Sequence, residues 1–76
     1  MPVSLAQVHK AHPVRITKVH GDDPLTYRLM EMGLIEGAEV TVLGRAPLGD
    51  PLHVRLGDYE LSLRAEEAAL VDVTEL

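Results

Sequence analysis

Three histidines near the N-terminus come closest, by type and spacing, to residues that do chemistry. His9 and His12 form a His-x-x-His pair, and His20 follows in the next segment. Three imidazoles would suit Zn²⁺ or Fe²⁺. However, His12 precedes Pro13, and a residue before proline avoids the helical region, so the pair should not share a regular helix face. We expect solvated side chains that bind Zn or Ni only weakly and adventitiously, with no functional metal site and no cofactor.

Catalytic groups are sparse in this chain. A nucleophile needs a base, and the base needs a group that orients it. Ser4 is interpreted as a helix cap and Ser62 as an outward strand residue, and no histidine has a carboxylate at a suggestive spacing. His53 is expected to point outward from its strand. There is no cysteine, which excludes a Cys nucleophile and thiolate metal sites. We predict that the chain has no catalytic residues and is not an enzyme.

The composition limits the kinds of binding partner and the cellular compartment that we expect for this protein. The 76 residues are enough for one domain, expected over residues 1–76. Seven Lys and Arg against twelve Asp and Glu give a net charge of −5. This charge argues against binding nucleic acid or an anionic lipid surface. No apolar run approaches a membrane span and no signal-peptide core is visible, so we expect a cytoplasmic protein that does not insert into the membrane.

The elements that would position these residues begin with a short helix. Ser4 and Gln7 fit a capping box, and the helix should end before Pro13 while placing Leu5 and Val8 on the core. A half-buried strand follows at residues 14–17, with a bulge near its end that returns the next valine to the core.

A second helix is predicted at residues 24–32. Asp23 is its N-cap and Pro24 its first residue. Three apolar residues recur on one face of this helix, which should meet the core: Leu25, Leu29 and Met32.

The end of this helix fixes how the chain enters the following strand. Gly33 stands where a left-handed C′ residue is needed, and Leu34 follows as C″, so an apolar contact with Leu29 would complete a Schellman ending. Gly37 is expected to supply a second unusual backbone angle before the strand.

The rest of the chain predicts mostly strands. They lie at residues 39–43, 52–56 and 59–63, and the last two are joined by Gly57-Asp58 in a type II′ turn. One helical turn at 65–69 and a short strand at 71–73 follow, with a fraying tail at 74–76. Five short strands favour closure into a small barrel, because an open sheet would expose long edges. The prediction is a mainly β, five-stranded SH3-like barrel with a helix inserted after the first strand.

Two exposed features are candidate docking surfaces. Tyr27 and Met30 are i, i+3 neighbours off the core face, and Arg28 and Glu31 flank them as a polar rim. Tyr and Met are enriched at protein interfaces. The alternative is that the N-terminal helix covers the apolar pair.

The second feature is the loop at residues 45–51. Its two prolines and its glycine suit a rigid turn, and a docking loop fits equally well. Leu48 favours docking slightly, because an apolar loop tip has little to pack against.

Three segments resemble one known family. The run at residues 28–34 with Gly37, the loop at 45–51 and the segment 63–68 occur in the order and spacing of the ferrous-iron transport protein A (FeoA) family. One departure is that the family usually has a glycine before the first strand, where this chain has Ala11-His12-Pro13.

The resemblance implies an SH3-like barrel with a non-enzymatic accessory role in bacterial ferrous-iron uptake. Its partner would be the cytoplasmic part of a FeoB-type membrane transporter, which carries a GTPase domain. Two alternatives stay open: a divalent-metal-binding regulatory domain that senses Fe(II), and a general SH3-like adaptor unrelated to iron. Binding of proline-rich peptides is not expected, because two tyrosines cannot build an aromatic groove.

Overall fold

The computed structural model describes residues 3–9 and 11–76. Strands, two short α-helices and one 3-10 turn alternate along the chain. In order they are β1 (Val3–Ser4), η1 (Leu5–Gln7), β2 (Pro13–Val19), α1 (Pro24–Glu31), β3 (Glu39–Arg45), β4 (Leu52–Leu56), β5 (Tyr59–Leu63), α2 (Ala65–Ala68) and β6 (Val71–Glu75).

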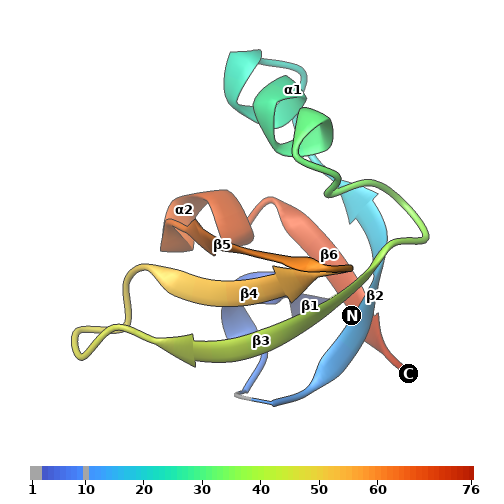
Figure 1. Ribbon diagram of the computed structural model, residues 1–76. Coiled ribbons are helices and arrows are strands. Elements are labelled where there is room, and N and C mark those ends of the chain that lie inside the picture. The colour runs from blue at the N-terminus through green and yellow to red at the C-terminus, as the bar shows by residue number, and fades with distance from the viewer. Residues whose placement is uncertain (1–2, 10) are drawn as a thin grey trace.

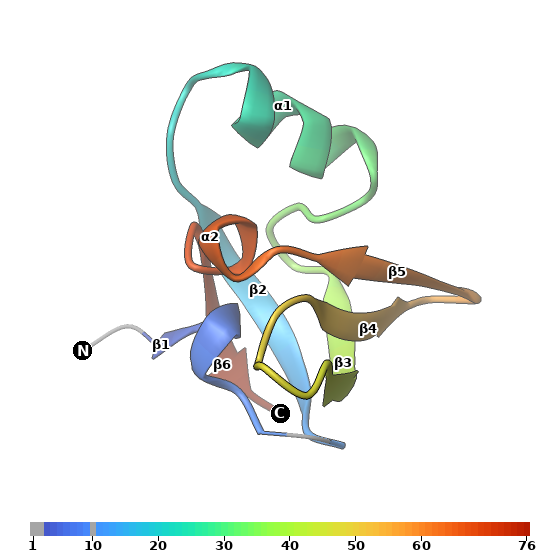
Figure 2. The same cartoon turned by 90° about the vertical axis from the view of Figure 1, so that its left-hand side faces the viewer.

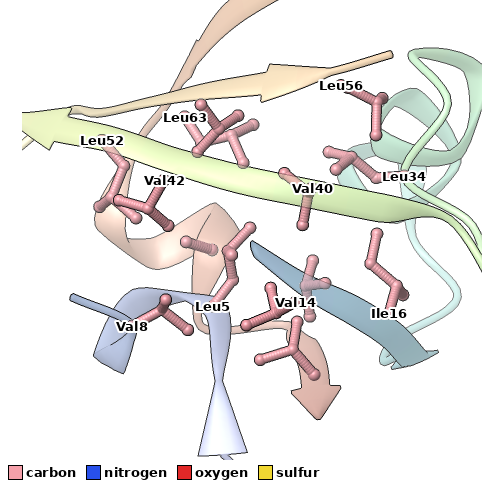
Figure 3. Close-up of a cluster of buried hydrophobic side chains, with 14 of the residues drawn as sticks. Leu5, Val8, Val14, Ile16, Leu34, Val40, Val42, Leu52, Leu56 and Leu63 are labelled. Carbon is pink, nitrogen blue, oxygen red and sulfur yellow. The ribbon is translucent and has the colours of Figure 1, made fainter. Parts of the chain in front are cut away.

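The six strands form one antiparallel sheet in the order β1-β6-β2-β3-β4-β5. The sheet curls round the core, and η1 and α2 pack on each other on the inner side of the curl (Figures 1 and 2). The core is aliphatic and draws on nearly every element, including Leu5, Ile16, Val40, Leu52 and Leu63 (Figure 3). The predicted mainly β, SH3-like architecture is confirmed.

The β4–β5 hairpin has the predicted bounds. Leu52, Val54 and Leu56 are buried while the residues between them are exposed, as alternation requires. Leu56 pairs with Tyr59 across the two-residue turn. Gly57 has φ +63°, as the first position of a type II′ turn demands.

The bulge in the first long strand is also confirmed. The pairing of β2 with β6 shifts register between Ile16 and Lys18. Val19 is half-buried and packs against the core. The bulge therefore returns Val19 to the inner face of the sheet, as predicted.

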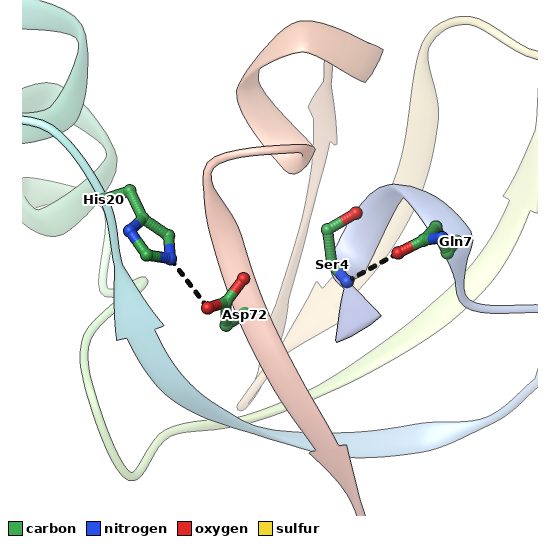
Figure 4. A network of polar contacts seen from close by, with 4 residues as sticks. All are labelled: Ser4, Gln7, His20 and Asp72. Atoms are coloured by element: carbon green, nitrogen blue, oxygen red, sulfur yellow. Dashed lines mark hydrogen bonds and ion pairs between the residues drawn. The ribbon is translucent and has the colours of Figure 1, made fainter. Parts of the chain in front are cut away.

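Three predictions about the chain ends differ from the structure. The sheet has six strands, because Val3 and Ser4 pair with β6 as a short strand of their own. The tail does not fray over its full length: Thr74 pairs with Arg15 and Glu75 with Val14. In both cases a neighbouring strand offers backbone groups that the local sequence does not reveal. The predicted N-terminal helix is only the 3-10 turn η1, in which the Ser4 N–H donates to Gln7 Oε1 at 2.9 Å (Figure 4).

Helix α1 starts as predicted but faces the core differently. The Asp23 carboxylate accepts from the Thr26 N–H at 3.0 Å, with Pro24 as the first helical residue. Leu29 is fully buried and Met32 half-buried against the core, but Leu25 is not among the core contacts. Thr26 is buried instead, at 2% exposure, which its hydroxyl tolerates by donating to the His20 carbonyl at 2.9 Å.

The end of α1 is the predicted Schellman motif. Gly33 has φ +101°. The Leu34 N–H donates to the Leu29 carbonyl at 3.1 Å, and the Gly33 N–H donates to the Met30 carbonyl at 3.0 Å. Leu29 and Leu34 are both fully buried, so the helix end is pinned to the core. Its outward residues therefore have a fixed direction.

Candidate functional site: the outer face of helix α1

Helix α1 stands away from the sheet at one end of the molecule and packs on α2 (Figures 1 and 2). Because Thr26 and Leu29 point inward, the opposite side faces solvent. Tyr27 is 56% exposed and Met30 43% exposed. We call these two residues, with exposed Arg28 and Glu31, the α1 face.

The alternative cover for this pair is excluded by the geometry. Leu5 and Val8 are buried in the core, as predicted, and do not cover Tyr27 or Met30, which remain 56% and 43% exposed. Tyr27 and Met30 are therefore surface residues, which is what a docking interpretation needs. Their role as a binding site stays a prediction.

Leu48 lies elsewhere. It is 96% exposed at the tip of the β3–β4 loop. The α1 face precedes β3 and the loop follows it, and a seven-residue strand separates its ends by about 20 Å. Both views place α1 and this loop at opposite ends of the molecule. The structure thus does not unite Leu48 with the α1 face in one site.

The β3–β4 loop is held on both flanks. The Gly49 N–H donates to the Ala46 carbonyl at 2.7 Å, which closes the turn. On one side, the Arg45 guanidinium donates to carbonyls of η1 and of Val8. On the other, Asp50 Oδ1 accepts from the Ala65 N–H at 2.9 Å, at the start of α2. The loop is therefore a rigid turn that also displays an exposed apolar tip.

The histidines do not gather into a metal site. Within residues 3–9 and 11–76, no three His, Asp or Glu side chains are placed to hold a metal ion. His9 and His12 are exposed at the strand entry. His20 is occupied elsewhere, with its Nε2 2.6 Å from Asp72 Oδ2 (Figure 4).

Two histidines do have carboxylate partners, contrary to the expectation from their spacing in the sequence. Asp72 meets His20 across the β2–β6 pairing, and His53 Nε2 lies 2.8 Å from Glu60 Oε1 across the β4–β5 hairpin. Only the His53–Glu60 pair has a signal in the sequence, namely its place in the predicted hairpin. Beside the first pair, the Thr26 hydroxyl donates to the backbone carbonyl of His20 and not to its ring, so it is not aligned with this pair as a nucleophile.

Two further exposed apolar residues lie beside the end of α1. Tyr59 is 48% exposed, and its hydroxyl donates to the Met32 carbonyl at the helix C-cap. Ile35 is 47% exposed in the turn that follows Leu34. They extend the apolar surface near the α1 face towards β5. Tyr59 lies in the predicted strand 59–63, but its contact with the helix was not predicted.

Comparison with known proteins gives the family. The FeoA domain model matches residues 3–75. A fusion of Fe(2+) transport protein A with the Fe(2+) transporter FeoB from Porphyromonas gingivalis is 39% identical over 69 residues, which cover 91% of this chain and 8% of that protein. The chain thus corresponds to a small part of this long relative.

Solved structures agree with this result. A FeoA-like protein from Clostridium acetobutylicum is 33% identical with a TM-score of 0.92, over 99% of this chain and 87% of its own. FeoA from Stenotrophomonas maltophilia was solved with zinc and is described as a prokaryotic SH3 domain protein. It is 30% identical with a TM-score of 0.83, over 95% of this chain and 89% of its own. No helix in the described part of the chain is long and apolar enough to cross a membrane. The chain belongs to the FeoA family.

Proposed function

We propose that this chain is a non-enzymatic accessory component of bacterial ferrous-iron uptake that acts in the cytoplasm on a FeoB-type transporter. The observation that carries the proposal is the Porphyromonas gingivalis relative, in which a homologous segment and a FeoB transporter form one polypeptide. Covalent linkage raises the effective concentration of two modules for each other, and it is useful where they work in contact. A binding surface for the transporter is therefore expected on this fold.

The α1 face is the proposed binding surface. It offers two part-exposed apolar side chains, Tyr27 and Met30, on a helix whose two ends are fixed by the Asp23 cap and the Gly33 motif. A rigid presentation lowers the ordering cost of binding. Arg28 and Glu31 supply one charge of each sign at the rim, where charges contribute more to orientation than to affinity.

The test replaces Tyr27→Ser and Met30→Ser together and measures binding to the cytoplasmic part of a FeoB-type transporter by calorimetry. The thermal midpoint should change little because both side chains are part-exposed, while the affinity should fall by tenfold or more. Leu76→Ser, at a residue 56% exposed at the C-terminus, is the matched control and should bind normally. If the double variant unfolds readily or binds as tightly as the parent, the α1 face is not the binding surface.

Leu48 is proposed as a second, separate contact. Leu48→Ser should leave stability unchanged, since the side chain touches little, and should weaken binding of the same transporter fragment. A parental affinity would show that the loop is only a rigid turn. Direct metal sensing has less support, because the described residues do not bring His9, His12 and His20 together.

A further inference from the structure

Strand β5 is an open edge of the sheet. It pairs with β4 alone among the described elements. Leu56 and Tyr59 close the two-residue turn as a hydrogen-bonded pair, and such pairs alternate with non-hydrogen-bonded ones along an antiparallel ladder. The backbone groups of Leu61 and Leu63 therefore face β4. Those of Glu60 and Ser62 face away from the sheet, and no partner for them occurs among the described residues.

The opposite edge of the sheet is less available. There β1 is two residues long and the chain turns at once into η1. A short edge strand is a common way of blocking strand addition. β5 is five residues long, contains no proline and has no inward-pointing charge. It is the edge of the described sheet that is best suited to accept another strand.

The surroundings of β5 define what would fit there. Both views place α1 above β5, and α2 follows the end of β5 directly (Figures 1 and 2). Tyr59 is tied to the end of α1 by its hydroxyl, and Leu61 is half-buried against the core. The inner side of the edge is thus apolar. On the outer side lies the Glu60 carboxylate, within 2.8 Å of His53 and 3.9 Å of Arg55.

We propose that β5 is an acceptor edge for an extended segment of the transporter's cytoplasmic part, which adds a strand to the sheet. This inference rests on the proposed function. Main-chain bonds to Glu60 and Ser62 would hold the segment, and alternate side chains would select it. Apolar residues of the segment face the helices beside Leu61, and polar or basic residues face the outer side beside Glu60.

A second copy of this chain would fit the β5 edge less well than a segment of the transporter. Each chain carries a net charge of −5, so self-association brings like charges together. Pairing of two β5 strands would also bring a Glu60 from each copy onto one sheet. A basic or neutral segment from another protein meets no such repulsion.

The first experiment is amide hydrogen exchange by NMR on the labelled protein, with and without the unlabelled cytoplasmic part of a FeoB-type transporter. In the free protein the Glu60 and Ser62 amides should exchange fast, while the Leu61 and Leu63 amides, bonded to β4, should be protected. Binding should slow exchange at Glu60 and Ser62 by at least tenfold. Binding with unchanged exchange at both positions overturns the acceptor edge and leaves the proposed function standing.

The second experiment compares Ser62→Pro with Ser62→Ala. Proline removes an outward N–H that the β4 ladder does not use, so the fold should persist, and it blocks an incoming strand. Ser62→Pro should weaken binding of the transporter fragment about tenfold or more, whereas Ser62→Ala, which keeps the N–H, should bind as the parent does. Equal affinities of the two variants overturn the inference. Failure of the parent itself to bind overturns both this inference and the proposed function.

Discussion

Gly33 is the residue on which the position of α1 depends most directly. Its φ of +101° is unfavourable for any residue with a Cβ, and a Cβ there would meet Leu56 Cδ2 at 2.9 Å and the Tyr59 hydroxyl at 3.1 Å. Gly33→Ala should therefore lower the free energy of unfolding by about 1 kcal/mol or more. Thermal denaturation measures this, and a stability equal to that of the parent would contradict the left-handed cap.

At Ala11, a substitution between the same two residue types should stabilise the protein instead. It has φ +68°, the left-handed conformation that favours glycine, at the strand entry, and its N–H donates to the Val42 carbonyl. The chain thus keeps the glycine-type geometry with an alanine, at a cost in strain. Ala11→Gly should stabilise the protein by about 0.5–1 kcal/mol in chemical denaturation. Ala69→Gly, where φ is −66°, is the control and should give no gain.

At the scale of the element, α1 depends on its N-terminal cap. It is eight residues long, too short to be stable by itself, so its capping bonds matter. Asp23→Ala removes the acceptor for the Thr26 N–H and should cost about 1 kcal/mol, measured by denaturant unfolding. Asp22→Ala changes an exposed neighbouring carboxylate and should have little effect. Equal losses for both variants would point to a general charge effect instead of capping.

At the scale of the whole molecule, charge and composition argue against binding of nucleic acid. With a net charge of −5 and only two aromatic residues, Tyr27 and Tyr59, we expect neither a phosphate-binding surface nor a stacking platform for bases. Fluorescence anisotropy at physiological salt should detect no binding to single-stranded or duplex DNA or RNA. A salt-sensitive micromolar affinity would contradict this expectation and favour an RNA-binding barrel.

The sequence by itself determined the features that depend on neighbouring residues. The cap at Asp23, the left-handed Gly33 and the Gly57-Asp58 hairpin are set by backbone preferences of residues one to four positions apart, which a single sequence displays. Helical periodicity also placed Tyr27 and Met30 off the core face, while the structure decided that they are exposed. These local rules were enough to predict five of the six strands of the described sheet, the inserted helix and the residues of the α1 face.

Tertiary structure alone decided what depends on residues far apart in the chain. The pairing of Val3 with Val73, the contact of His20 with Asp72 and the bond from Tyr59 to the end of α1 have no local signal. Each needs strands or helices to be in place before two side chains or backbones can meet. The same reason explains why Leu48 and the α1 face proved to be separate, and why β5 lies at an edge of the sheet, opposite the short edge strand β1.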